Sequence, residues 1–111
     1  FGKYYGNTNV DGTFVYTGFK PAMIIFKALA NGNSWRVMNS GTSPTNPANA
    51  SHVIESNSNA DETGSAEFCD FLSNGFKLRC TGKSNAGTTF IYMAFAEQPF
   101  VTSTGVPTTA R

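Results

Sequence analysis

The sequence predicts an all-β domain, either an antiparallel β-sandwich or a jelly roll, built from about seven or eight short strands. Three observations lead to this class. The apolar stretches are short and rich in aromatic and β-branched residues, which favours strands over helices. Gly, Pro, Asn and Asp interrupt the chain too often for long helices. Turn signals recur between the apolar stretches, namely Asp11-Gly12, Lys20-Pro21, Asn31-Gly32-Asn33, Asn74-Gly75 and Ala86-Gly87.

Eight apolar stretches are the expected strands, and the sixth and seventh form a hairpin. In chain order they are Phe1–Tyr5, Thr13–Thr17, Ala22–Leu29, Ser34–Asn39, His52–Glu55, Glu67–Leu72, Phe76–Thr81 and Thr88–Glu97. At 111 residues the chain is expected to form one domain, with residues 1–98 in the sandwich and 99–111 as an extended tail. The polar segment 40–65 is a long connection of a kind that is often functional.

The composition excludes several classes of partner. Eight basic residues nearly cancel seven acidic ones, and a net charge of +1 gives no electrostatic reason to expect nucleic acid or an anionic membrane surface. No apolar run approaches the roughly 20 residues that a membrane-spanning helix needs, so we expect no membrane insertion. Ten Phe and four Tyr make aromatic rings the main expected core material.

The hairpin in "EFCDFLSNGFKLRC" is the clearest local signal, and it allows two registers. A two-residue Asn74-Gly75 turn would pair Phe71 with Leu78. A four-residue loop, 72–75, with its last residue in the left-handed conformation, would pair Phe71 with Phe76 instead. Both registers keep apolar residues opposite apolar ones and acid opposite base, whereas a three-residue loop would not. The sequence therefore decides the parity of the loop and leaves its length open.

Two of the expected strands, 22–29 and 88–97, are apolar on both faces. A sandwich strand with one solvated face would alternate, so we expect these two to be central strands whose second face is also covered. The cover is either the long loop of the same chain or a neighbouring subunit, and the sequence does not choose between them. The candidate subunit interface consists of Met23, Ile25, Ile91, Met93 and Phe95.

No constellation of residues predicts catalysis. His52 is the only histidine, it sits in an expected strand, and no G-x-S-x-G motif supplies a nucleophile. Asp61, Glu62, Glu67 and Asp70 do not follow the pattern of a calcium loop, and solvated charges account for them. We expect no enzyme activity, no cofactor and no metal site.

Cys69 and Cys80 lie on the two arms of the expected hairpin and face the same way. In the two-residue register they would oppose each other at a hydrogen-bonded pair, where the geometry suits a disulfide less well. The sequence favours two buried thiols that pack as small hydrophobic residues, and it does not exclude pairing.

A glycan-binding platform is the one ligand site that the aromatic residues suggest. Trp35 is the best candidate, with Asn33 and Arg36 beside it as hydrogen-bonding groups. Trp35 and Val37 would share one strand face, and Arg36 and Met38 the other. We favour the interpretation that Trp35 anchors the core over the interpretation that it stacks on a sugar. The other aromatic candidates are Tyr4, Tyr5, Tyr16 and Tyr92.

Four segments resemble, in this order, a module of tailed-bacteriophage tail-fibre and related virion proteins: "DGTFVYTGFKPAMIIFK", "SWRVMNS", "DFLSNGFKLR" and "TTFIYMAFAEQPF". The resemblance extends from about residue 11 to residue 100, and four motifs in the right order are more specific than any one of them. The matching residues are Gly18, Phe19, Pro21 and Lys27, then Phe71, Ser73, Asn74, Gly75, Phe76 and Leu78, then Tyr92, Met93, Phe95, Ala96 and Glu97.

The resemblance implies a structural module of the virion, part of a tail fibre involved in host attachment and assembled in the host cytoplasm. Tail fibres are usually trimers, so the partners it implies are copies of the same chain, other virion proteins, and a host-surface glycan if the module binds the receptor. The alternative is a capsid-decoration or tail-connector module that binds only other virion proteins. The host, the receptor and the oligomer order do not follow from the sequence.

Overall fold

The structure, a computed structural model, describes residues 1–41, 53–59 and 69–97. These residues form two antiparallel sheets, which confirms the all-β sandwich predicted from the sequence. The five-stranded sheet has the order β1-β8-β3-β4-β5, and the three-stranded sheet has the order β2-β7-β6. The elements are β1 (Gly2–Tyr5), β2 (Phe14–Tyr16), β3 (Pro21–Ala28), β4 (Arg36–Asn39), β5 (Ile54–Glu55), β6 (Cys69–Leu72), β7 (Gly75–Leu78), the 3₁₀ turn η2 (Lys83–Asn85) and β8 (Thr89–Ala96).

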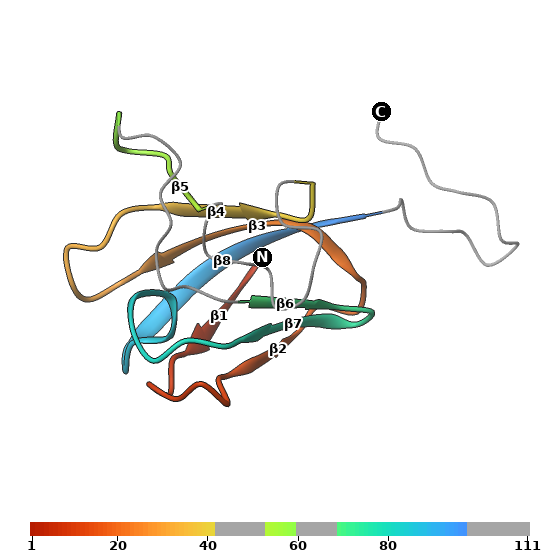
Figure 1. Cartoon of the computed structure of the whole chain (residues 1–111), viewed down its shortest axis with the longest axis horizontal. Coiled ribbons are helices and arrows are strands. Elements are labelled where there is room, and N and C mark those ends of the chain that lie inside the picture. Colours follow the sequence, from red (N-terminus) through yellow and green to blue (C-terminus); the bar gives the residue numbers. More distant parts are fainter. Residues whose placement is uncertain (42–52, 60–68, 98–111) are drawn as a thin grey trace, which may run out of the picture.

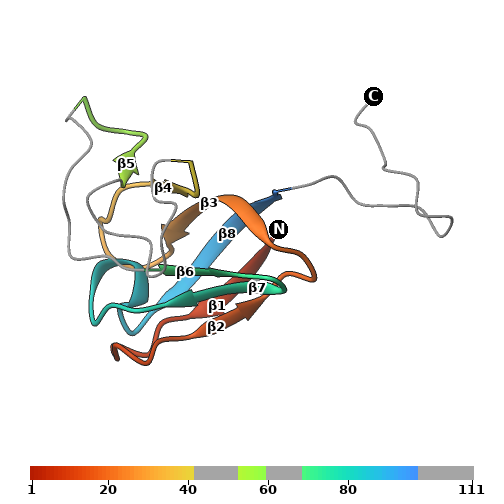
Figure 2. The same cartoon turned by 45° about the vertical axis from the view of Figure 1, so that its right-hand side comes forward.

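Each of the eight expected strands is present within the described residues, with ends that differ by at most three positions. Figure 1 shows the two sheets as separate layers, with β8 between β1 and β3 in the larger one, and Figure 2 shows the same layers after a turn. The expected tail, 99–111, and much of the segment 40–65, including His52, lie outside the described residues. None of the described residues forms a helix long and apolar enough to span a membrane.

The core lies between the two sheets and is built around aromatic rings. Tyr4 stacks on Phe90 with 4.9 Å between ring centroids, and it meets Phe76 edge-on at 6.0 Å. Because β1 and β8 carry the first two rings and β7 carries the third, this cluster joins the two sheets. The hydroxyl of Tyr4 donates to the carbonyl of Ser84 at 2.7 Å, so its one polar group is satisfied inside the core.

The strands that are apolar on both faces are neighbours at the centre of the large sheet, as predicted. β3 and β8 pair over most of their length, from Pro21 opposite Ala96 to Ala28 opposite Phe90. Their inner residues, such as Ile24, are buried in the core. Their other residues point away from the core and form the outer face that is described below.

The hairpin adopts the register that pairs Phe71 with Phe76, so the alternative with Leu78 is wrong. Leu72 also pairs with Gly75, which shortens the connecting loop to two residues. Gly75 is not left-handed, contrary to the expectation. A glycine is required here because β2 lies so close: a Cβ at position 75 would lie 2.1 Å from the carbonyl oxygen of Val15.

A buried asparagine closes one end of the sandwich, and the sequence did not predict this role. Asn85, in η2, is 0% exposed. Its amide nitrogen donates to the side-chain oxygen of Asn7 and to the carbonyls of Asn9 and Cys80, at 2.7 to 2.8 Å. Its amide oxygen accepts from the backbone nitrogen of Asn7. Since buried polar groups are costly unless they are paired, this set of bonds fixes the loop that leads from one sheet to the other.

Candidate functional site

The outer face of the five-stranded sheet carries an apolar row that crosses all of its strands. Ile54 pairs with Val37, Val37 pairs with Ile25, and Ile25 pairs with Met93. Extending the β1–β8 ladder by one residue places Phe1 beside Met93. Directly paired residues point to the same side of a sheet, so these five side chains lie side by side.

Two further rows extend this apolar surface along β8. On one side of the central row, Phe95 pairs with Met23. On the other side lies Ile91. Phe95 is 45% exposed and Ile91 is 36% exposed, while Phe1 is 97% exposed. A continuous exposed apolar surface marks an interaction site in soluble proteins, so the outer face of the large sheet is the candidate functional site.

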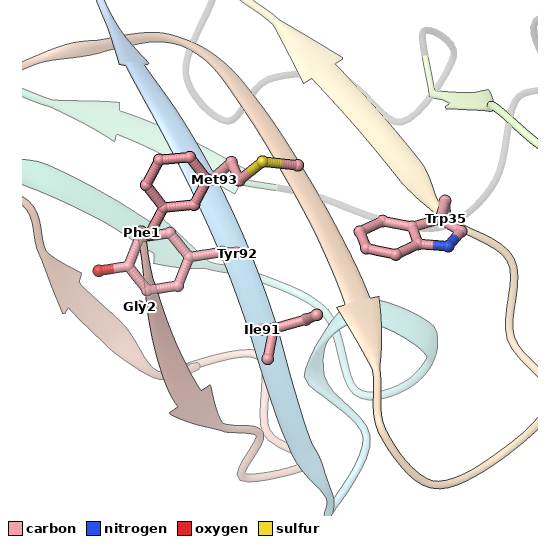
Figure 3. Close-up of a pocket in the computed structure, with 6 residues that line it drawn as sticks. All are labelled: Phe1, Gly2, Trp35, Ile91, Tyr92 and Met93. Atoms are coloured by element: carbon pink, nitrogen blue, oxygen red, sulfur yellow. The ribbon is translucent and has the colours of Figure 1, made fainter.

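A hollow of about 290 Å³ lies on this face. Its lining is almost wholly apolar. Figure 3 shows Trp35 at one end of the hollow and Phe1 and Tyr92 at the other, with Ile91 and Met93 between them. The lining residues are Phe1, Gly2, Trp35, Ile91, Tyr92 and Met93. Such a lining suits an apolar side chain and offers few hydrogen bonds to a sugar.

The charges on the outer face are distributed unevenly along β8. Lys3 and Lys27 both pair with Ile91, one from each side, so two positive side chains flank the hollow. The ammonium group of Lys27 donates to the carbonyl of Asn33. At the opposite end of β8, Glu97 forms an ion pair with Lys20 at 2.8 Å. One end of the face is therefore positive and the other is neutral overall.

The three residues proposed for glycan contact do not come together on one surface. Arg36 is 6% exposed and lies on the inner side of β4, where it binds the carboxylate of Glu55 at 3.0 Å. Burial lowers the pKa of Arg36, and Glu55 partly opposes the shift. Trp35 lies on the outer face and is only partly buried, so the interpretation of Trp35 as a core anchor is wrong. Asn33 is partly buried in the β3–β4 connection.

The remaining aromatic candidates are divided between the core and the surface. Tyr4 is buried, and Tyr92 packs edge-on against Phe76 with 5.3 Å between centroids. Tyr5 and Tyr16 are exposed, but Tyr16 stands on the other sheet and Tyr5 stands on β1, three strands away from β4, which Trp35 precedes. They therefore form no common platform with Trp35.

The outer face of the three-stranded sheet carries paired charges beside two exposed aromatic residues, Phe14 and Tyr16. The ammonium of Lys77 lies 2.6 Å from the carboxylate of Asp11, and the Nε atom of Arg79 lies 2.7 Å from that of Asp70. A longer contact of 3.7 Å joins Arg79 to Asp11. The hydrogen bond from Lys77 lowers the pKa of Asp11, and the bond to Asp70 raises the pKa of Arg79. These four charges satisfy one another.

Both cysteines are buried free thiols, as the sequence favoured. Cys69 pairs with Leu78, so it does not oppose Cys80. Burial raises the pKa of Cys69, and the sulfur of Cys80 lies 3.1 Å from the hydroxyl of Ser84. Among the described residues no group of three potential metal ligands comes together. His52, Asp61, Glu62 and Glu67 lie outside those residues.

Comparison with known families finds one match, the domain of unknown function DUF7483, over residues 1–99. The chain belongs to this family. Neither the curated proteins nor the solved structures contain a match to it. Membership of the DUF7483 family therefore accounts for nearly the whole chain and leaves its role to be argued from the structure.

The candidate site contains the five residues that the sequence assigned to an interface, and four more. Met23, Ile25, Ile91, Met93 and Phe95 all lie on the outer face. Alternation along β4 could have revealed Val37, and Ile54 required knowledge that β5 joins the same sheet. Phe1 and Trp35 were visible as aromatic residues, but the sequence does not show which face they occupy. The additional members are Phe1, Trp35, Val37 and Ile54.

Proposed function

We propose that this member of the DUF7483 family is a structural module of a tailed-phage virion, part of a tail fibre, and not an enzyme. The resemblance of its motifs to tail-fibre modules supports the virion setting. The observation that carries the structural role is the apolar row across all five strands, Ile54–Val37–Ile25–Met93–Phe1, which faces outward. A neighbouring subunit buries this face in the assembled appendage.

The energetics favour a protein partner for this face. Burial stabilises by roughly 25 cal/mol for each Å² of apolar surface removed from water, and the row offers aliphatic and aromatic side chains throughout. Loss of charged residues from the centre and their retention at the rim is typical of protein interfaces. Lys3 and Lys27 lie beside Ile91 toward one end of the face and Glu97 lies at the other end, while the row Ile54–Val37–Ile25–Met93–Phe1 between them carries no charged residue.

Substitution in the phage that encodes the chain tests this function. Met93→Glu places a carboxylate in the centre of the face, and we expect the amount of chain in purified particles to fall about tenfold or more, because an unpaired charge would be buried on assembly. Quantitative mass spectrometry of the particles measures this. Tyr16→Glu is the matched control, since Tyr16 is 69% exposed on the other sheet, and it should leave incorporation unchanged.

Two results would contradict the proposal in different ways. Absence of the wild-type chain from purified particles overturns the virion assignment. Normal incorporation of the Met93→Glu variant, once circular dichroism has shown that both variants fold, overturns the role of the face. Immunogold labelling of the particles then separates a fibre from a capsid-decoration or connector module, which would label the capsid or the tail barrel.

A further inference from the structure

We infer that the outer face of the large sheet pairs with the same face of a second copy, with the two β8 strands antiparallel. The inference rests on the proposed function, in which this face is buried against a neighbouring subunit. It adds the identity of the partner and its orientation. Two independent features of the face lead to this arrangement: a protruding side chain beside a hollow, and an uneven distribution of charge.

The protruding side chain is Phe95, and the hollow lies two to four residues away along the same strand. Phe95 is 45% exposed, and Ile91 and Met93 form the part of the hollow that β8 contributes. A two-fold axis that lies between the two faces, perpendicular to the strands near residue 94, brings residue 95 of one copy over residue 93 of the other. The same operation seats both copies of Phe95 in both hollows at once.

This two-fold axis also keeps β8 of one copy over β8 of the other. It reverses the direction of the strands, but it does not move any strand along the direction in which the strands follow one another across the sheet. Sheets that pack face to face keep their strand directions within about 30° of each other, so the arrangement is an ordinary one for β-sheets. The hollow holds one ring from the partner, and its apolar lining matches an aromatic side chain.

The charges oppose the parallel alternative. Lys3 and Lys27 flank Ile91, and Glu97 stands at the other end of β8 in an ion pair with Lys20. The antiparallel arrangement brings Glu97 of one copy over Ile91 of the other, between the two lysines. A parallel arrangement would stack the lysines of the two copies on each other, and like charges placed opposite one another oppose association.

Association is expected to be weak, because only β3 and β8 are long and the other strands of the face are short. We therefore expect a reversible equilibrium between monomer and dimer, measured by light scattering over a range of concentrations up to the millimolar. Phe95→Ala should weaken the dimer at least about tenfold, since it empties both hollows. Val10→Ala, at a residue that is 60% exposed in the β1–β2 connection, should leave the dissociation constant unchanged.

Chemical cross-linking tests the orientation. Face-to-face sheets lie about 10 Å apart, too far for a direct disulfide, so a short bis-maleimide is the suitable reagent. An Ile91→Cys variant is mixed with a ¹⁵N-labelled Glu97→Cys variant, both of which keep Phe95, and mass spectrometry identifies the products. The native thiols are buried, so wild-type chain is the unreactive control.

Each outcome decides the inference. Preferential linkage of residue 91 in one copy to residue 97 in the other supports it. Preferential 91–91 and 97–97 linkage means that the strands run parallel, and it overturns the orientation. A trimeric mass overturns the pairing and agrees with the three-fold arrangement implied by the tail-fibre resemblance. A monomer at every concentration, without cross-links, overturns pairing with a second copy. That result leaves the proposed function to be decided separately, by the incorporation of the Met93→Glu variant into particles.

Discussion

The two outer faces of the sandwich differ in how many charged side chains they carry. On the three-stranded sheet, Asp11, Asp70, Lys77 and Arg79 form ion pairs with one another. Each of these charges therefore has a partner within the chain. On the five-stranded sheet the corresponding surface is an apolar row with a hollow beside it. The difference teaches that the candidate interface is the face whose middle row, Ile54–Val37–Ile25–Met93–Phe1, carries no charged residue.

The largest effect that separates the two sheets is expected from glycine substitutions. Gly75→Ala should lower the free energy of unfolding by about 3 kcal/mol, because its Cβ would lie 2.1 Å from the Val15 carbonyl and would force β2 away from β7. Gly32→Ala, in the connection between β3 and β4, has no atom within 4 Å of its Cβ and should be neutral or slightly stabilising. Urea unfolding of both variants measures the difference. Equal effects would contradict the tight seam between β2 and β7.

A smaller effect is expected where the large sheet contacts η2. Tyr4→Phe removes the hydrogen bond to the Ser84 carbonyl and should cost about 1 kcal/mol at pH 7. Burial raises the pKa of Tyr4 well above its usual value near 10, so the unfolded chain loses this proton first. The free energy of unfolding of the wild type should therefore fall as the pH rises above about 10, and less steeply for Tyr4→Phe. If the free energy of unfolding fell equally steeply with pH for the two proteins, the pKa of Tyr4 would be the same in the folded and unfolded chains, which would contradict its burial.

The smallest effect concerns the charged face. The ion pair between Asp11 and Lys77 lowers the pKa of Asp11 in the folded chain. The Asp11 carboxylate therefore stabilises the folded chain fully above its pKa in the unfolded chain, near 3.9. This stabilisation is lost as the pH falls through the lower pKa of the folded chain. Asp11→Asn should slightly reduce stability at pH 7 and should flatten the loss of stability below about pH 4. Urea unfolding at a series of pH values measures both. Added salt should shrink the difference between the two proteins, as it does for exposed ion pairs.

The strands could be predicted from the sequence because their signals are local. Apolar runs bounded by Gly, Pro and Asn fixed all eight, and double apolarity identified β3 and β8 as central. The hairpin register could not be predicted, because β2 decides it: Gly75 lies against the Val15 carbonyl, a contact between residues distant in the chain.

The candidate site was predictable in part for the same reason. The outward residues of β3 and β8 follow from alternation once both strands are known to be central. On β4, each face carries two residues that could be buried, and the pairing of Arg36 with Glu55 on β5 decides which face points inward. Asn85 was missed because a polar residue beside a turn is usually solvated, and only the folded chain brings its bonding partners around it.

The position of β8 has a consequence for the order in which the molecule is made. Among the described residues the first strand, β1, has its ladder partner in the last strand, β8, and β3 also pairs with β8 on one side. During synthesis from the N-terminus, the apolar residues of β1 and β3 therefore emerge long before the strand that joins them. A nascent chain that stops before Thr89 lacks the centre of its larger sheet, so folding has to wait until the last strand has left the ribosome.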